Sequence, residues 1–517
     1  MIDARLLLAA LLPVLALAHP CLPCHTKEVD GFAKTPMAHS IAVVGTQPEG
    51  AFDHAFSRTH FTIRNEAGGV RQTVERRDEW DSIAESVTVQ YAIGSGSHAF
   101  GYLAEIGNHL FQSPVSYYTK RKIWDVAPGY ETTSEPDFSR PVTVECVLCH
   151  SDRPRPIANT LNSYQSPPFA QLGIQCDRCH GPSEAHLKNP VPGTIINPAK
   201  LPVAARDSIC EQCHLSGEVR IPNPGKSIAD FHPGERMEDV YTVYVVPHGP
   251  EQASNAKSIK VISQAEQLAL SACARNSGGK LWCGTCHNPH ETPAQPAEYF
   301  RERCLSCHGT TLSASHAAPG RDCVACHMPS RPAKDGGHTA FTDHRIARKP
   351  DEGIAAPARD DLAAWREPDP SVQQRNLALA LVTSGMENRK PNQVIRGYKM
   401  LNRLGPSLNG DAAALTVLGN VLLTGKQPVE AEHEFAKALA LRPNFAPYEV
   451  NLAGAMLAAG DTAGAVPHLE TALKLDPLLS QAIDLLSQAY SKQGQEAKAN
   501  DLIAHYRAAM GISVITK

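Results

Sequence analysis

The chain has 517 residues, of which 20% are charged and 42% are hydrophobic, and its formal net charge is −4. This length allows two or three domains, and the weak negative charge excludes a broad basic surface for nucleic acid. Forty prolines and 36 glycines indicate a protein rich in loops.

The first 18 residues predict a secretory signal peptide. One basic residue, Arg5, precedes an apolar run from Leu6 to Leu17, and Ala16-Leu17-Ala18 forms a cleavage site of small residues. The run is shorter than the roughly 18 residues of a membrane-spanning helix. We therefore expect an exported protein, periplasmic or extracellular, that has no transmembrane anchor of its own.

Seven Cys-x-x-Cys-His motifs follow between residues 21 and 327. This spacing is the attachment signal for c-type haem: both thiols form thioethers with the porphyrin, and the histidine binds iron as the proximal ligand. A zinc half-site or a redox dithiol does not require that histidine. We predict seven covalent haem c groups. The attachment residues are Cys21, Cys24, Cys146, Cys149, Cys176, Cys179, Cys210, Cys213, Cys283, Cys286, Cys304, Cys307, Cys323 and Cys326. The proximal ligands are His25, His150, His180, His214, His287, His308 and His327.

Residues 19–345 therefore form a predicted haem domain, mainly α-helical and with an irregular core packed around haem. Within it, residues 46–145 contain no cysteine and read as a small β-rich insertion. Short β-prone runs lie at residues 61–64, 70–74, 87–93 and 115–118. Helical turns and irregular loops are expected around the six later motifs.

Proline-rich residues 346–370 are predicted to be a linker, and residues 371–517 a solenoid of paired helices. Leucines recur 34 residues apart at Leu418, Leu452 and Leu486. Alanines do so at residues 431, 465 and 499, and Pro443 and Pro477 each close a repeat. This period and the small residues resemble the tetratricopeptide repeat, and a generic helical bundle is the alternative. Such repeats present surfaces for partner proteins.

A second axial ligand is expected for each haem iron. The candidate distal histidines are His186, His290, His98, His338 and His344, although any one of them could be an ordinary surface histidine. Met37 and Met328 are possible thioether ligands. Two imidazoles on one iron give a low potential that suits electron transfer.

Two segments resemble known cytochromes. Cys21–Ala38 resembles the first haem segment of the tetrahaem cytochromes that accept electrons from hydroxylamine oxidoreductase. Cys176–His186 resembles a segment shared by those cytochromes and by hydroxylamine oxidoreductase itself. The later part, including Cys283–His290 and His338–His344, is similar to exported multihaem cytochromes c that carry C-terminal tetratricopeptide repeats. The resemblance implies stacked haems and distal ligands at His186 and His290.

One departure from the tetrahaem family lies in the first segment. This chain has Met37 where the family has a histidine, and His39 is a candidate substitute. Cys273, the fifteenth cysteine, has no predicted intramolecular partner. It reads as a buried small side chain, with an intermolecular disulfide or a role near the haem at Cys283 as the alternatives.

Two classes of function fit these features. The first is an electron-transfer cytochrome with a repeat domain that docks a redox partner or builds an oligomer. The second is a multihaem oxidoreductase acting on a small nitrogen or sulfur compound at one open haem, with unknown catalytic residues. The chain has no Cys-x-x-Cys-Lys motif, the mark of the catalytic haem in pentahaem nitrite reductases, so we favour the first. We further expect residues 19–345 to keep all haems without the repeats, the alternative being that the repeats buttress the haem domain.

Overall fold

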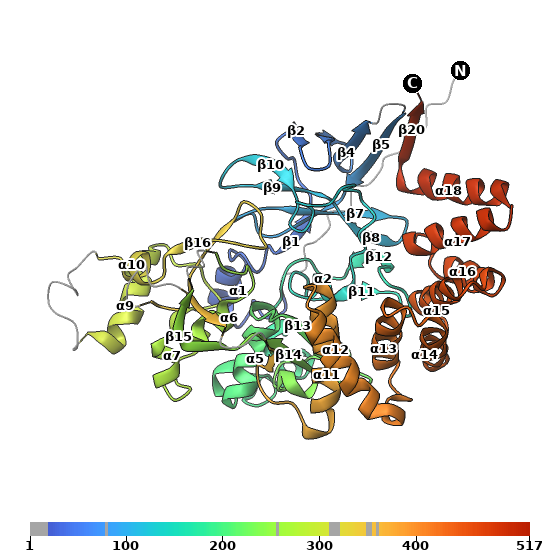
Figure 1. Cartoon of the computed structure of the whole chain (residues 1–517). Coiled ribbons are helices and arrows are strands. Elements are labelled where there is room, and N and C mark those ends of the chain that lie inside the picture. Colours follow the sequence, from blue (N-terminus) through green and yellow to red (C-terminus); the bar gives the residue numbers. More distant parts are fainter. Residues whose placement is uncertain are drawn as a thin grey trace, which may run out of the picture.

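The computed structural model describes residues 19–77, 81–254, 258–309, 321–347, 354–357 and 361–516. The predicted signal peptide, residues 1–18, lies outside the described residues. A β-rich N-terminal part and a central part with short helices lie beside a stack of paired helices at the C-terminal end (Figure 1).

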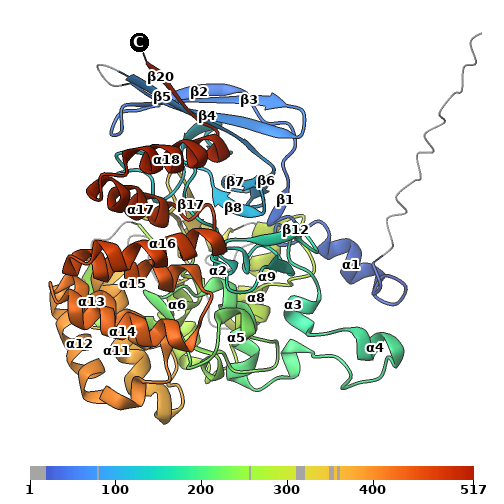
Figure 2. The same cartoon turned by 90° about the vertical axis from the view of Figure 1, so that its right-hand side faces the viewer.

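The β-rich part contains a five-stranded antiparallel sheet. In spatial order its strands are β2 (Gly50–His54), β3 (Thr59–Glu66), β4 (Gly69–Arg77), β5 (Asp81–Val89) and β20 (Ile512–Thr516). The last strand comes from the C-terminal end of the chain and pairs with β5 (Figure 2). No pattern in the sequence predicts this strand. The C-terminal end is therefore hydrogen-bonded into the N-terminal sheet.

A second antiparallel sheet and a hairpin complete this part. The sheet consists of β1 (Ile41–Val43), β6 (Tyr91–Ile93), β7 (Gly101–Ile106) and β8 (His109–Gln112), and the hairpin of β9 (Val115–Tyr118) and β10 (Ile123–Val126). Alternating residues of β3, such as Phe61 and Ile63, are buried and share one apolar core with Tyr102 of β7. The predicted small β-rich region is confirmed.

The central part contains short elements, and most of its helices contain or adjoin a motif. Its helices are α1 (Thr26–Phe32), α2 (Val144–Val147), α3 (Asp177–His180), α4 (Glu184–Lys188), α5 (Val203–His214), α6 (Gln264–Ala269), α7 (Ala272–Asn276), α8 (Cys283–Cys286), α9 (Pro296–His308) and α10 (Cys323–His327). Single 3₁₀ turns are η1 (Pro198–Lys200), η2 (Ile228–Asp230) and η3 (Met237–Asp239). Short strands are β11 (Pro154–Pro156), β12 (Tyr164–Phe169), β13 (Val219–Pro222), β14 (Tyr241–Val245), β15 (His248–Ser254), β16 (Ser330–Pro332) and β17 (Ala340–Thr342).

Eight helices form the C-terminal stack of tetratricopeptide-like repeats. They are α11 (Pro370–Glu387), α12 (Pro391–Leu404), α13 (Ala412–Thr424), α14 (Pro428–Leu441), α15 (Ala446–Ala459), α16 (Thr462–Leu475), α17 (Ser480–Lys492) and α18 (Glu496–Met510), with the 3₁₀ turn η4 (Gly405–Leu408). The periodic alanines 431, 465 and 499 are all buried. A Cβ at Gly419 would lie 2.5 Å from the Phe435 ring, which explains the small residue where two helices touch. The predicted helical repeat is confirmed.

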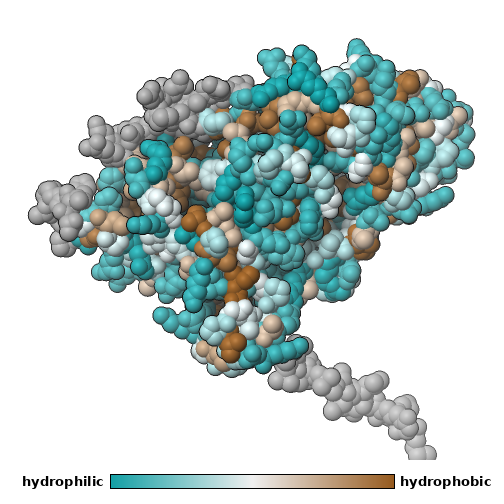
Figure 3. All heavy atoms as spheres, turned by 90° about the horizontal axis from the view of Figure 1, so that it is seen from below, coloured by the Kyte–Doolittle hydropathy of each residue, from teal (hydrophilic) through white to brown (hydrophobic). Residues whose placement is uncertain are grey.

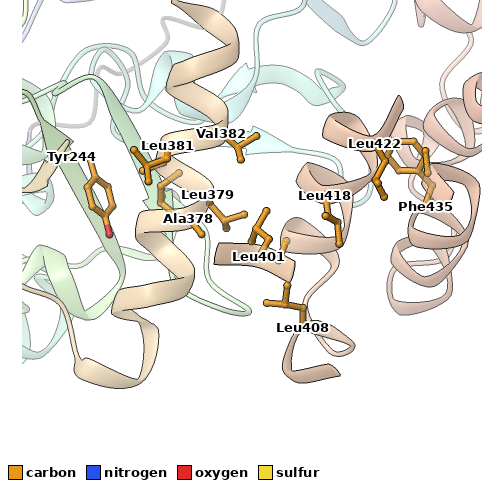
Figure 4. Close-up of a cluster of buried hydrophobic side chains, with 14 of the residues drawn as sticks. Tyr244, Ala378, Leu379, Leu381, Val382, Leu401, Leu408, Leu418, Leu422 and Phe435 are labelled. Carbon is orange, nitrogen blue, oxygen red and sulfur yellow. The ribbon is translucent and has the colours of Figure 1, made fainter. Parts of the chain in front are cut away.

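The repeats and the central part share one apolar core. Tyr244 on β14 packs in a cluster with Leu379 and Leu381 of α11, and the cluster continues through Leu401 of α12 to Phe435 of α14 (Figure 4). Leu379, Leu381 and Leu401 are at most 3% exposed. Burial of such side chains stabilises a fold by about 1.5–3 kcal/mol each. This core therefore joins the two regions into one unit.

The predicted linker 346–370 also belongs to the folded structure. Its strands β18 (Ile354–Pro357) and β19 (Ala363–Ala364) pair with β15 and β14. Trp365 Nε1 donates a hydrogen bond of 3.0 Å to Glu211 on α5, and Arg366 forms an ion pair with the same carboxylate. The described part of this segment thus fastens the repeats to the helix that carries the fourth motif.

A buried polar contact joins the repeats to the β-rich part. His109 Nε2 on β8 lies 2.9 Å from an oxygen of Asp476, the residue that follows α16, and both side chains are buried. Together with β20 and the shared core, this contact favours the alternative that the repeats buttress the haem domain, because groups of both parts are buried in these contacts.

No helix among the described residues is long and apolar enough to cross a membrane. Seen from below, the surface is mostly hydrophilic, and its hydrophobic atoms form separate patches (Figure 3).

Candidate haem-binding sites

Each motif forms a single helical turn or the end of a helix. In the first, third and fifth motifs the histidine amide donates a 2.9 Å hydrogen bond to the carbonyl of the first cysteine, as His25 does to Cys21. The fourth and sixth motifs end α5 and α9. Residues three and four positions apart lie on one face of a helical turn. Both thiols and the imidazole can therefore reach one porphyrin.

The helices around the last three motifs contain no buried residues, in contrast to the repeats. This holds for α7, α8, α9 and α10, whereas α11 alone buries nine residues. Helices in proteins are stabilised mostly by burying an apolar face, and α9 has 13 residues. Covalently attached porphyrins would supply the missing apolar surface. The packing of this part therefore fits the haem that the motifs predict.

Three of the proximal histidines face a second histidine ring. The ring centres of His25 and His186 are 6.4 Å apart, with 32° between the ring planes. Those of His180 and His290 are 5.9 Å apart at 22°.

The third pair, His287 and His344, has a separation of 6.2 Å at 27°. A metal–imidazole bond is about 2 Å long, so two imidazoles on opposite sides of one iron place their ring centres roughly 6 Å apart. All three separations fit two axial ligands of one haem iron. His186, His290 and His344 are three of the five candidate distal ligands.

Each pair joins distant segments of the chain. His186 on α4 follows the third motif but faces the histidine of the first, and His290 follows the fifth motif but faces that of the third. The sequence indicates these histidines but does not assign them to particular haems, because no local spacing links a distal histidine to its proximal partner.

Hydrogen bonds at Nδ1 orient the paired imidazoles. His186 Nδ1 lies 2.9 Å from Thr194 Oγ1, and His344 Nδ1 lies 2.9 Å from the carbonyl oxygen of Thr342. His180 Nδ1 lies 2.8 Å from the carbonyl oxygen of Ile196. A partner at Nδ1 fixes the ring and leaves Nε2 as the metal ligand. Thr194 is a supporting residue that the sequence did not reveal, since it belongs to no motif.

The same arrangement occurs at two further proximal histidines. His150 Nδ1 lies 3.1 Å from the Ser40 carbonyl oxygen, and His327 Nδ1 lies 2.8 Å from the Ala347 carbonyl oxygen. For the haems predicted at His150, His214, His308 and His327, both the cofactor and its second axial ligand stay predictions.

Burial keeps several of these imidazoles neutral. It lowers the pKa of His150, His214, His287, His290 and His344 below the ordinary histidine value. Nearby histidines lower the pKa of His287 and His290 further. Only the neutral ring has a lone pair for a metal, so the surroundings favour the ligand form.

Several cysteines of different motifs lie close to each other. The sulfurs of Cys21 and Cys176 lie within 4.8 Å of each other. Neighbouring thiols also shift the pKa of Cys149, Cys210 and Cys304, through Cys213, Cys283 and Cys323 respectively. These pairs join the first motif to the third, the second to the fourth, the fourth to the fifth, and the sixth to the seventh.

Two weaker electrostatic effects act between further motifs. Cys179 of the third motif raises the pKa of Cys210 in the fourth, and Cys286 of the fifth raises that of Cys304 in the sixth. Since a porphyrin would attach at each sulfur, the attachment points of all seven motifs form one connected series.

The two other candidate distal ligands differ from each other. His98 packs 4.3 Å from the Phe341 ring centre, and its Nδ1 is buried without a hydrogen-bond partner, so one nitrogen is available. His338 has both nitrogens engaged: Nε2 lies 2.6 Å from Asp125, and Nδ1 lies 3.1 Å from Arg121. Iron binding at His338 would break one of these contacts.

Three further residues singled out in the sequence lie near the first and fifth motifs. His39, the proposed substitute in the first segment, has Nε2 2.8 Å from the Ala33 carbonyl oxygen. The carbonyl oxygen of Met37 accepts a hydrogen bond from the Ile174 amide, and the role of Met37 as a thioether ligand stays a prediction. Cys273 is half-buried on α7 and lies within electrostatic range of Cys286, so it lies near the fifth motif.

Comparisons with known proteins leave the family open. No protein-family model matches the chain, and no curated protein matches it. Among solved structures, MamA is similar over 27% of this chain and 78% of its own, with 19% identity and a TM-score of 0.23. A structure described as nearly identical TPR-like repeats of a Podospora anserina kinesin light chain covers 28% of this chain and 77% of its own, with 20% identity and a TM-score of 0.24.

Proposed function

We propose that this protein is an exported multihaem c-type cytochrome that carries electrons between redox partners. One observation carries the proposal: three motif histidines each face a further histidine, with ring centres 5.9–6.4 Å apart. When bound, haem c supplies one-electron redox chemistry.

The chain's own residues would hold and isolate the cofactors. The motif cysteines attach them, and the paired imidazoles occupy both axial positions at the sites of His25, His180 and His287. Two protein ligands leave no position for a substrate, which favours electron transfer over catalysis at these three sites. The connected series of motif cysteines supports transfer along the molecule rather than isolated redox centres.

Reductive titration tests this function. The exported protein should take up seven electrons per chain from dithionite, since each predicted haem accepts one. Full reoxidation by a soluble electron acceptor should follow, without turnover of hydroxylamine, nitrite or sulfite. Catalytic turnover of one of these compounds would support the oxidoreductase alternative instead.

The repeats support a role in partner binding. Stacked helical pairs form extended surfaces that bind other proteins. Because the stack shares a core with the central part, a partner bound there would be held beside the predicted haems.

A further inference from the structure

The first helical pair of the repeats has a basic surface on an acidic protein. Residues 388–404 contain five lysines and arginines and no aspartate or glutamate, although the whole chain has a net charge of −4. Haem propionates would make the rest of the protein more acidic still. A local reversal of charge of this kind favours a partner of opposite sign.

Three of these cations line a groove between α11 and α12. The groove has a volume of about 510 Å³, and Gln374, Ile395, Arg396, Lys399, Met400 and Arg403 lie along it. Arg396, Lys399 and Arg403 are three, four and seven positions apart on α12, so they share one face of that helix. All three are exposed.

Two of the three cations are free to bind a ligand. Arg396 donates hydrogen bonds of 2.7 Å to both carboxylate oxygens of Asp361. Lys399 and Arg403 have no ion pair or hydrogen bond with any residue that the structure describes. On binding an acidic ligand they therefore gain an electrostatic partner without losing one among the described residues.

The groove also has an apolar contact point. Ile395 is 51% exposed and lies one residue before Arg396, beside the half-buried Met400. An exposed isoleucine next to unpaired cations can bind a ligand segment that has an apolar side chain between carboxylates. The lower face of the molecule, on which α11 and α12 lie in Figure 1, has only separate hydrophobic patches (Figure 3). A membrane would need a broader apolar surface.

We infer that the α11–α12 groove binds an acidic peptide segment of a partner protein, with an apolar side chain on Ile395 and carboxylates on Lys399 and Arg403. The inference rests on the proposed function only in making this partner a redox protein. Arg396 in the groove pairs with Asp361, in the segment whose Trp365 and Arg366 bind Glu211 on α5, so such a partner would dock on the side of the repeats that this segment ties to the helix of the fourth motif.

The test uses the full-length, haem-loaded protein and a fluorescein-labelled peptide, Asp-Leu-Glu-Glu-Leu-Asp-Glu-Leu, in fluorescence anisotropy at low salt. Lys399→Glu with Arg403→Glu should weaken binding about tenfold or more, since two attractive charges become repulsive. Ile395→Asn should also weaken binding but leave its salt dependence unchanged.

The matched control is Lys474→Glu with Lys492→Glu, the same charge change at exposed positions of later helices, and it should bind like the wild type. Equal binding by the groove variant, or equal loss in the control, would overturn the inference. Binding of phosphatidylglycerol vesicles through the same lysine and arginine, with none of the peptide, would also overturn it. Haem absorption of the same samples is read separately, so missing haem would count against the cytochrome proposal alone.

Discussion

Helices α7–α10 and helices α11–α18 belong to one molecule but bury their surfaces differently. The first group, around the last three motifs, has no buried residues, whereas every helix of the second has buried side chains. A chain can do without an apolar core only where another apolar body fills that space. The repeats thus bury side chains against one another, whereas α7–α10 have the low burial expected of a region that packs around the predicted cofactors.

The repeats also share buried contacts with the central and β-rich parts, and a truncation of the chain would remove these contacts. Ending the chain after residue 347 should abolish soluble, haem-loaded protein, because the shared core, β20 and the His109–Asp476 contact are lost together. Yield and haem staining after export measure this. A truncated protein with full haem content would show that residues 19–345 fold alone.

The shared core can be weakened by a single substitution. Leu401→Ala should destabilise the protein by about 2–5 kcal/mol, since Leu401 is fully buried in the cluster that the repeats share with the central part. Leu441→Ala, at an exposed position in the same repeats, should change stability by about 0.5 kcal/mol or less. Urea unfolding compares the variants, and equal effects would contradict the role of the core.

A buried carboxyl beside β20 should make stability pH-dependent. Burial, with a smaller effect of Asp137, raises the pKa of Glu85 to about 8, whereas an unfolded chain has a glutamate pKa of about 4.3. The folded protein keeps this proton to higher pH, so its stability falls as the pH rises between these two values.

When the pH is raised from about 6 to about 8, the wild type should therefore lose roughly 2 kcal/mol more stability than Glu85→Gln. Urea unfolding of the wild type and the variant at both pH values measures the difference. Parallel losses in the two proteins would mean that Glu85 is ionised in the folded state.

Substitution of a paired histidine should change stability least but should clearly change the spectrum. His290→Ala should convert one low-spin iron to high spin, because its ring faces His180 at 5.9 Å. His338→Ala is the control, since both of its nitrogens already contact protein groups. Electron paramagnetic resonance of the oxidised proteins distinguishes them. A spin change only in the His338 variant would reverse the two assignments.

Local sequence patterns predicted the local structure well. The 34-residue spacing of leucines and alanines located the repeats, and β-prone runs such as residues 61–64 located β3. Residues 87–93 read as one strand, but the structure divides them at Gln90 between two sheets.

Contacts between distant segments could not be predicted in this way. β20 pairs with a strand more than 400 residues earlier, and Ile512–Thr516 has no local signal for that partner. The pairing of His186 with His25 likewise depends on how the motifs pack in space. The sequence identified the histidines by their place after motifs, but only the fold assigns them to pairs.

The central claim is that the motif region is organised around seven covalent haems. Intact mass spectrometry of the exported protein from a host that matures c-type cytochromes tests this most directly. The account predicts a mass that exceeds the mature polypeptide by seven haem groups, one for each Cys-x-x-Cys-His motif. A soluble, folded protein that carries no haem, or five haems or fewer, would contradict it.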